Sequence, residues 1–490
     1  MAVVYHSTML SLRRLAAALM AIVLAAQPVR ADDLPELGDV ASSELPLTAE
    51  KRIGQQIMNQ IRWREPSYLD DPDIETYLNQ LGNRLVAVSD DPGFGFTFFA
   101  IADPSINAFA MPGGYIGVHT GLILAAQSES ELAGVLAHEI SHVTQRHIAR
   151  QVYQSKKLSM ASMVAMGLAL LAARSSPQAA SAAITGAQAG AISAQLAYSR
   201  DFERESDRIG FDMLRRAGFD PRGMAGFFTR LQQNAGLYEN TATAYLRTHP
   251  LTGERLSDMQ NREQATTYRQ IPDSIDFLLV RARVRALAGR PADAVAEFET
   301  QLRERKYSAE AAARYGMAVA LARAGNWAAA ERELAAVRRM NVSSPMVYRL
   351  QAEVRLARGD REGGMALLRE ANARFPMNTA LAVDYGRALL AQRRFADALN
   401  YADEQLLGYP QELRFHQIRA DAYAGIGRRS QHHLALAEMS LLKDQTAGAI
   451  EQLELAQKAG DGNFYEMSVI DGRLREVRRR QLEEMKERRN

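Results

Sequence analysis

The spacing of hydrophobic residues divides the chain into two regions. Between residues 50 and 265, helical patterns alternate with short apolar runs typical of strands, whereas residues 272–458 carry helical patterns alone. The sequence therefore predicts a mainly α protein with a small β-sheet, in which an α+β domain precedes an all-α array of helices.

The α+β region is expected to open with two helices, because apolar residues recur there every three or four positions. They are Ile53, Ile57 and Ile61, followed by Ile74, Leu78, Leu81 and Leu85. Strands are expected over residues 94–101 and 107–118, the second interrupted by Met111-Pro-Gly-Gly114. An exposed edge of this sheet could hold a substrate peptide as an added strand, or the sheet could serve packing alone.

The helical region contains a repeat. Five short turns recur at spacings of 36, 34, 34 and 34 residues, which is the tetratricopeptide period. They are Ala288-Gly-Arg290, Ala324-Gly-Asn326, Arg358-Gly-Asp360, Gln392-Arg-Arg394 and Ile426-Gly-Arg428. Small residues follow four of these turns where helices pack closely, namely Ala294, Ala330, Gly364 and Ala398. Such an array presents a surface to peptides or partner proteins, and it carries no catalytic pattern of its own.

The end of the chain is expected to close this array. A helix over residues 446–458 is predicted to cap the stack. Residues 459–490 form a basic helical tail, and the stretch 471–490 holds eight basic and five acidic residues. We interpret this stretch as a solvated, fraying helix, with a recognition segment as the alternative.

The amino-acid composition limits the kinds of ligand and of metal site that the chain can have. The 490 residues have a net charge of +2, so no overall field favours nucleic acid or an acidic substrate. There is no cysteine, which excludes disulfides and thiolate metal ligands. Any metal site must therefore use His, Glu or Asp.

The amino terminus predicts export. Arg13 and Arg14 precede an apolar run over residues 15–26, and Val29-Arg-Ala31 provides small residues for cleavage. We interpret residues 1–31 as a signal peptide cut after Ala31, because an apolar run of about a dozen residues is too short to span a bilayer. Residues 32–49 are expected to form a poorly ordered leader.

The stretch from Leu132 to Thr144 contains the strongest chemical signal, His138-Glu-x-x-His142. Ser128-Glu-Ser-Glu131 has the form of a capping box, so both histidines are expected one turn apart on one face of a helix. Two imidazoles in this arrangement suit a zinc ion, and Glu139 would act as the general base beside a zinc-bound water. The alternative is a pair of surface histidines.

Two downstream segments bear on this site. Residues 158–198 predict a helical hairpin of apolar and small residues, which could pack on the core, cover the cleft or touch a membrane surface. Glu203 and Asp207 share one face of a later helix. Glu203 could be a third zinc ligand and Asp207 could orient a ligating histidine, or both could form surface salt bridges with nearby arginines.

Taken together, His138-Glu-x-x-His142, Glu203-x-x-x-Asp207 and Thr248-His-Pro250 resemble the glutamate-zincin family, which includes HtpX, the CAAX prenyl endopeptidases and the periplasmic BepA proteases. The signal peptide and the repeats are similar to the BepA group. The resemblance implies a zincin-type metalloprotease domain over residues 50–265, with one Zn²⁺ bound by His138, His142 and Glu203 and with Glu139 as catalytic base. Ser206 departs from the family pattern, which usually has Ala there.

The remaining histidines differ in what they predict. His147 is nine residues after His138, about 180° around a continuous helix, so it is expected to be structural rather than a ligand. His119 is expected to pack or hydrogen-bond. By the resemblance, His249 lies near the metal, where it could donate to the oxyanion or occupy the open zinc position and hold the enzyme latent. Arg255 is a weaker candidate for oxyanion contact, with a surface or ion-pair role as the alternative.

The sequence as a whole predicts a periplasmic zinc metalloendopeptidase whose repeats dock a substrate or partner. The resemblance to BepA implies unfolded or misassembled outer-membrane proteins as clients and the outer-membrane assembly machinery as a partner, in a role of quality control. The leading alternative is a chaperone or adaptor for outer-membrane proteins with a latent zinc site. The third possibility is a purely structural zinc site. Glu139 argues against it, because a structural site would not need this residue as a ligand.

Overall fold

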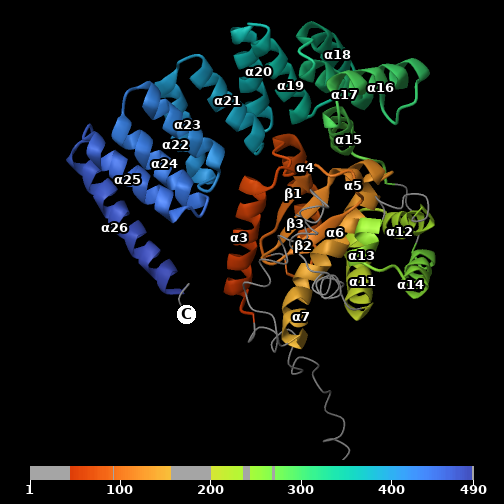
Figure 1. Ribbon diagram of the computed structural model, residues 1–490. Helices are drawn as coiled ribbons and strands as arrows, with labels where there is room; N and C mark the ends of the chain where they lie inside the picture. Colours follow the sequence, from red (N-terminus) through yellow and green to blue (C-terminus); the bar gives the residue numbers. More distant parts are fainter. Residues whose placement is uncertain (1–44, 92, 156–199, 235–242, 267–270, 488–490) are drawn as a thin grey trace, which may run out of the picture.

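The computed structural model describes residues 45–91, 93–155, 200–234, 243–266 and 271–487. Figure 1 shows an N-terminal domain with a small sheet, and an array of helices that arches over it from α15 to α26. The segments expected as a signal peptide (1–31) and a hairpin (158–198), and most of the expected leader, lie outside the described residues. Within the described residues, no helix has the length and apolar character needed to cross a membrane.

The N-terminal domain contains both predicted helices and the predicted strands. Its helices are α3 (Leu47–Arg64), α4 (Pro72–Val86), α5 (Thr120–Ala125), α6 (Glu129–Thr144), α7 (His147–Ser155), α11 (Arg200–Arg216), α12 (Arg222–Asn234), α13 (Thr243–Thr248) and α14 (Gly253–Gln264). Its strands are β1 (Thr97–Ile101), β2 (Ala108–Met111) and β3 (Tyr115–His119). The break predicted within residues 107–118 is therefore a turn between two strands.

The sheet has the order β1-β3-β2, with β3 parallel to β1 and antiparallel to β2. Gly113 and Gly114 make the β2–β3 turn at φ values of 80° and 85°, a conformation that glycine adopts without strain. Strand β2 is an edge of the sheet and packs beside α6. Of the two edge strands, β1 and β2, the strand β2 is therefore the one next to the histidine helix.

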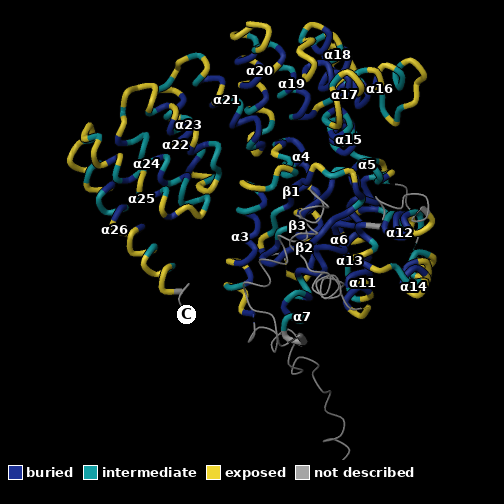
Figure 2. The backbone as a smooth tube through the Cα atoms, viewed as in Figure 1, coloured by how far each residue is buried: buried dark blue, intermediate teal, exposed yellow. Residues whose placement is uncertain are grey.

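Helix α6 runs through the middle of the N-terminal domain. The Ser128 side chain accepts a hydrogen bond from the Glu131 amide, as the capping pattern predicts. Residues 129–143 are all buried, because α4, β2, α11 and α12 pack around them (Figure 2). Gly210 lets α11 approach closely, since a Cβ there would lie 3.1 Å from the His138 backbone nitrogen. This close approach brings α11 side chains to the two histidines.

The array confirms the tetratricopeptide prediction. Its helices are α15 (Ile275–Leu287), α16 (Pro291–Glu304), α17 (Glu310–Arg323), α18 (Trp327–Arg339), α19 (Pro345–Ala357), α20 (Arg361–Arg374), α21 (Thr379–Ala391), α22 (Phe395–Gly408), α23 (Leu413–Gly425), α24 (Arg429–Leu442), α25 (Thr446–Ala459) and α26 (Phe464–Glu487). The middle residue of every predicted turn has a positive φ, including the non-glycine Arg393 at 59°. All four predicted small residues are buried.

The tail is helical, as expected, and most of its residues are exposed, but one face of the helix is buried rather than solvated. Helix α26 buries Ile470, Leu474 and Val477 in a cluster with residues of α25. Arg473 forms an ion pair with Glu438 of α24, and Arg480 forms one with Asp444 in the turn between α24 and α25. The apolar positions repeat at helical spacing among many charges, so this helix, rather than α25 alone, closes the stack.

The array and the N-terminal domain share a core and an ion-pair network. One hydrophobic cluster extends from Ile74 in α4 to Val354 in α19. At the start of α4, Asp71 lies 2.8 Å from Arg283 of α15, and Asp73 lies 2.6 Å from Arg349 of α19. These four side chains are at most 14% exposed. The first helices of these repeats therefore face α4 (Figure 1).

Candidate metal centre

Two imidazoles from α6 form the base of a buried cluster. His138 and His142 are fully buried, and their Nε2 atoms are 3.0 Å apart. The rings are inclined at 74° to each other, with centroids 4.7 Å apart. The helical spacing of four residues thus brings the two nitrogens to one point, as predicted.

Glu203 and His249 complete the cluster from two other helices. From α11, Glu203 places its carboxylate oxygens 3.4 Å from His138 Nε2 and 3.5 Å from His142 Nε2. From the end of α13, His249 places Nδ1 3.0 Å from Glu203 Oε1 and 3.3 Å from His138 Nε2. One potential ligand atom from each of these four buried residues lies within 4.8 Å of all the others.

This donor set fits a metal ion. Three imidazoles and a carboxylate are ligands that zinc accepts, and a bound cation would offset the cost of burying these polar groups together. Glu139 points its carboxylate toward the same space, with Oε1 3.4 Å from His249 Nε2. A backbone hydrogen bond from Ala110 of β2 also reaches this carboxylate. The buried Glu139 side chain therefore lies where it can contact a group that enters the site.

The pKa values leave His142 and Glu203 in forms that can bind a metal ion. Burial acts to lower the pKa of His138, but hydrogen bonds to Asp207 and Glu203 raise it to about 9, so a metal ion would displace a proton from this ring. Burial, reinforced by the charge of His138, lowers the pKa of His142 well below its usual range. Burial acts to raise the pKa of Glu203, but the charge of His249 and a hydrogen bond from His138 hold it well below its usual range. A neutral imidazole and an ionised carboxylate are the forms that bind metals. Burial raises the pKa of Glu139, which suits a group that must accept a proton near neutral pH.

Asp207 supports His138 from behind. Its Oδ1 lies 3.0 Å from His138 Nδ1, so that nitrogen donates and the ring presents Nε2 to the cluster. Arg255 holds Asp207 through two hydrogen bonds of 2.6 and 2.8 Å and also lies 2.7 Å from Glu203. Its side chain is 1% exposed, so Arg255 is a buried ion-pair arginine and the surface interpretation is wrong.

The other two histidines have separate roles. His119 is buried on β3, where Nδ1 lies 2.9 Å from Ser105 Oγ, as expected for a hydrogen-bonding residue. His147 is not part of the four-residue cluster, but the reason given from helical geometry is wrong. It begins a separate helix, and its Nδ1 lies 2.8 Å from His142 Nδ1.

Tyr245 is a site residue that sequence reasoning missed. It is fully buried and stacks on His249, with ring centroids 4.6 Å apart and planes 24° apart. Its hydroxyl has no hydrogen-bond partner among the described residues, and burial together with the Glu139 charge raises its pKa well above the usual range. The only sequence signal was its position four residues before His249.

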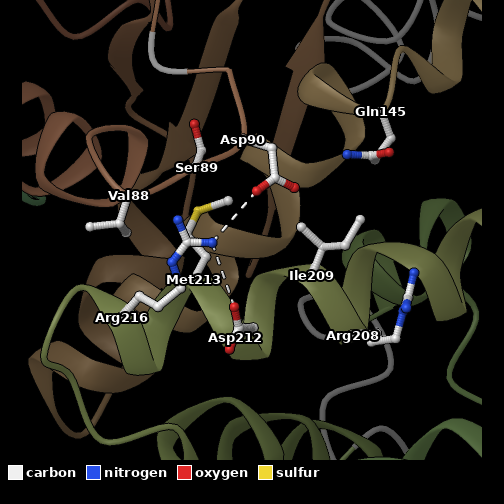
Figure 3. A pocket seen from close by; sticks show the side chains of 9 residues that line it. All are labelled: Val88, Ser89, Asp90, Gln145, Arg208, Ile209, Asp212, Met213 and Arg216. Atoms are coloured by element: carbon white, nitrogen blue, oxygen red, sulfur yellow. Dashed lines mark ion pairs between the residues drawn. The ribbon is translucent and has the colours of Figure 1, made fainter. Parts of the chain in front are cut away.

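A surface pocket lies on a different part of α11. Its volume is about 380 Å³, and Figure 3 shows Arg216 between Asp90 and Asp212, with Arg208 and Gln145 at the other side. None of the four cluster residues lines it. The buried cluster, rather than this pocket, therefore holds the candidate chemistry.

Comparisons with known proteins agree with the two regions. The family model "Peptidase family M48" matches residues 72–263, and a tetratricopeptide-repeat model matches residues 269–354. A Vibrio cholerae protein named as a beta-barrel assembly-enhancing protease is 34% identical over 422 residues, which cover 86% of this chain and 87% of that protein. The beta-barrel assembly-enhancing protease of Escherichia coli K12 is 31% identical, with 92% of each chain covered. A mitochondrial metalloendopeptidase of Arabidopsis thaliana is 28% identical over 42% of this chain and 39% of its own.

Proposed function

This chain belongs to the beta-barrel assembly-enhancing proteases of peptidase family M48, and from that membership we propose that it cleaves outer-membrane proteins in the periplasm with one zinc ion. The family makes it a metalloendopeptidase. The observation that carries the finer proposal is the buried convergence of His138, His142, Glu203 and His249. The predicted signal peptide supports the periplasm, and the clients follow from the names of the relatives.

In the proposed mechanism, His138, His142 and Glu203 hold zinc, which when bound supplies a Lewis acid for the scissile carbonyl. Glu139 accepts the proton of the attacking water and returns it to the leaving amine nitrogen. Asp207 and Arg255 keep His138 and Glu203 oriented. The edge strand β2 lies beside α6, where a substrate segment could bind in extended form through main-chain hydrogen bonds.

We assign His249 a latent role within this proposal. Its Nδ1 reaches the same point as the other donors, so His249 can serve as a fourth ligand that closes the open zinc position. Displacement of His249 by a substrate or partner would then open the site. This arrangement also supports the second candidate function, a chaperone or adaptor that binds outer-membrane proteins through its repeats while the site stays closed.

Glu139→Gln tests the proposed activity. We expect cleavage of an unfolded outer-membrane protein to fall by about 10²–10⁴-fold, because the general base is lost while the side-chain shape is kept. Zinc content, measured by metal analysis, should not change. Glu129→Gln is the matched control, since it makes the same change at the other end of α6 and should retain cleavage. If no chelator-sensitive cleavage occurs in the parent protein, the adaptor function is favoured instead.

His249→Ala tests latency. Removal of a ligand from the open position should raise proteolysis or autolysis, measured as the rate of client cleavage per bound zinc. An unchanged or lower rate would contradict latency and favour the role of His249 as an oxyanion donor.

A further inference from the structure

A break in the helix turns His147 toward the metal site. Helix α6 ends at Thr144, and α7 begins at His147. Between them, Arg146 adopts a left-handed conformation with a φ of 52°. The Arg146 side chain anchors this break, because it donates to the Leu45 carbonyl at 2.6 Å and lies 3.2 Å from the Glu50 carboxylate.

The His147 ring is held by partners on α7 and α11. Its Nε2 lies 3.0 Å from Glu205 Oε2, and Arg150 also donates to that oxygen at 2.8 Å. The ring stacks on Phe202, with centroids 4.4 Å apart and planes 11° apart. His147 is fully buried. These contacts fix both the position and the rotation of the ring.

The hydrogen positions follow from these contacts. Glu205 is an acceptor, so His147 Nε2 carries a hydrogen. The His147 Nδ1 of a neutral ring is then an acceptor, and it lies 2.8 Å from His142 Nδ1. His142 must therefore donate from Nδ1, which leaves its Nε2 lone pair directed at Glu203 and His138.

We propose that Glu205 and His147 form a positioning relay that sets the tautomer and orientation of the metal ligand His142. The two histidines of α6 are thus supported differently: Asp207 contacts His138 directly, whereas Glu205 acts on His142 through a second imidazole. The relay rests on the proposed function, because it matters only if His142 binds the metal. It makes metal affinity depend on a residue outside the ligand set.

The test measures Zn²⁺ affinity of the full chain by competition with a chromophoric chelator. All variants carry Glu139→Gln to prevent autolysis. His147→Phe keeps the stacking on Phe202 but removes the acceptor, and we expect about 10–100-fold weaker zinc binding. His147→Asn places an amide oxygen near the Nδ1 position, whereas His147→Gln places its amide near the Nε2 position. Asn should therefore restore most of the affinity and Gln should not.

A matched control separates the relay from general damage. His119→Phe makes the same change at another buried histidine, which lies beside the Asp103 carboxylate. His119 does not contact a proposed metal ligand, so zinc affinity should stay within about threefold of the parent value. Unfolding in urea reports the stability of each variant. A merely structural role would make affinity follow stability, whereas the relay predicts that Asn and Gln differ at similar stability.

The outcomes distinguish the two proposals. If the parent chain does not bind zinc, the proposed function fails. If the parent binds zinc and His147→Phe binds it equally well, the relay is overturned. If His147→Phe does not fold, equal affinities for the Asn and Gln variants would overturn the relay, and a clear advantage for Asn would support it.

Discussion

The repeat array and the metal centre are built from contacts of very different range. In the array, helices pack on others that are one or two elements away in the chain, and small residues return every 34 to 36 positions. In the centre, His138 meets His249 across 111 positions, and Arg255 meets Asp207 across 48. The array also keeps most of its charge at the surface, whereas the centre buries its charge. Periodicity therefore specifies the first region, and convergence of distant segments specifies the second.

Among the variants that compare the two regions, Arg255→Ala is expected to lower the free energy of unfolding the most. Removal of Arg255 leaves the buried carboxylates of Asp207 and Glu203 with only histidine partners, so we expect a loss of about 3–5 kcal/mol in the free energy of unfolding. Urea unfolding of the metal-free protein measures it. The control is Arg290→Ala in the array, where an exposed ion pair with Asp293 should contribute nothing measurable. Equal losses of unfolding free energy in both variants would contradict the proposed difference between buried ion pairs in the centre and exposed ion pairs in the array.

A destabilising substitution in the array is expected to affect the stability of the array and not the metal centre. Ala330→Leu adds volume at a fully buried helix contact, and we expect a destabilisation of about 1–3 kcal/mol from overpacking. Hydrogen exchange should locate the loss in α17 to α19, while zinc affinity remains that of the parent. Weaker zinc binding in this variant would mean that the two regions are coupled more tightly than their contacts indicate.

The smallest effect, taken per pH unit, is a pH dependence of zinc affinity that is confined to the centre. Burial alone would lower the pKa of His138, but hydrogen bonds to Asp207 and Glu203 raise it from 6.5 to about 9 in the metal-free protein. This proton stabilises the metal-free fold fully below pH 6.5, and its contribution is lost as the pH rises through about 9. Zinc displaces the same proton, so its affinity should rise with pH by up to about 1.4 kcal/mol per unit in that window.

Titration of zinc affinity at pH 7, 8 and 9 measures this prediction. Asp207→Asn is the informative variant, because it weakens the interaction that retains the proton and should flatten the curve. An affinity that does not change across the window would contradict a protonated His138.

The sequence predicted those parts of the molecule that depend on local pattern. The turns around Gly289, Gly325, Gly359 and Gly427 were found because a left-handed residue recurs there with the repeat. The cap at Ser128 and the i, i+4 pair of histidines were found because helix geometry alone places them. Family resemblance brought Glu203 and His249 to the same site, which spacing could not do.

The predictions that failed concern features that a local sequence pattern does not determine. His147 was placed on the far side of a continuous helix, but Arg146 interrupts that helix in a conformation usually left to glycine. For Arg255 the sequence could not decide between oxyanion contact, a surface position and an ion pair, because its two carboxylate partners lie about 50 positions earlier. The buried face of α26 was not predicted because its three buried apolar residues are outnumbered by charged residues.

The contact between α4 and the first repeats has a consequence for how the protein can be divided. Arg283 and Arg349 neutralise the two carboxylates that begin α4, and α15 covers the same apolar cluster. A gene fragment that stops near residue 265 would leave Asp71 and Asp73 without counterions and would uncover that cluster. The first repeats are therefore part of the folding unit of the catalytic domain. The change in hydrophobic pattern near residue 265 does not mark a boundary between independently stable domains.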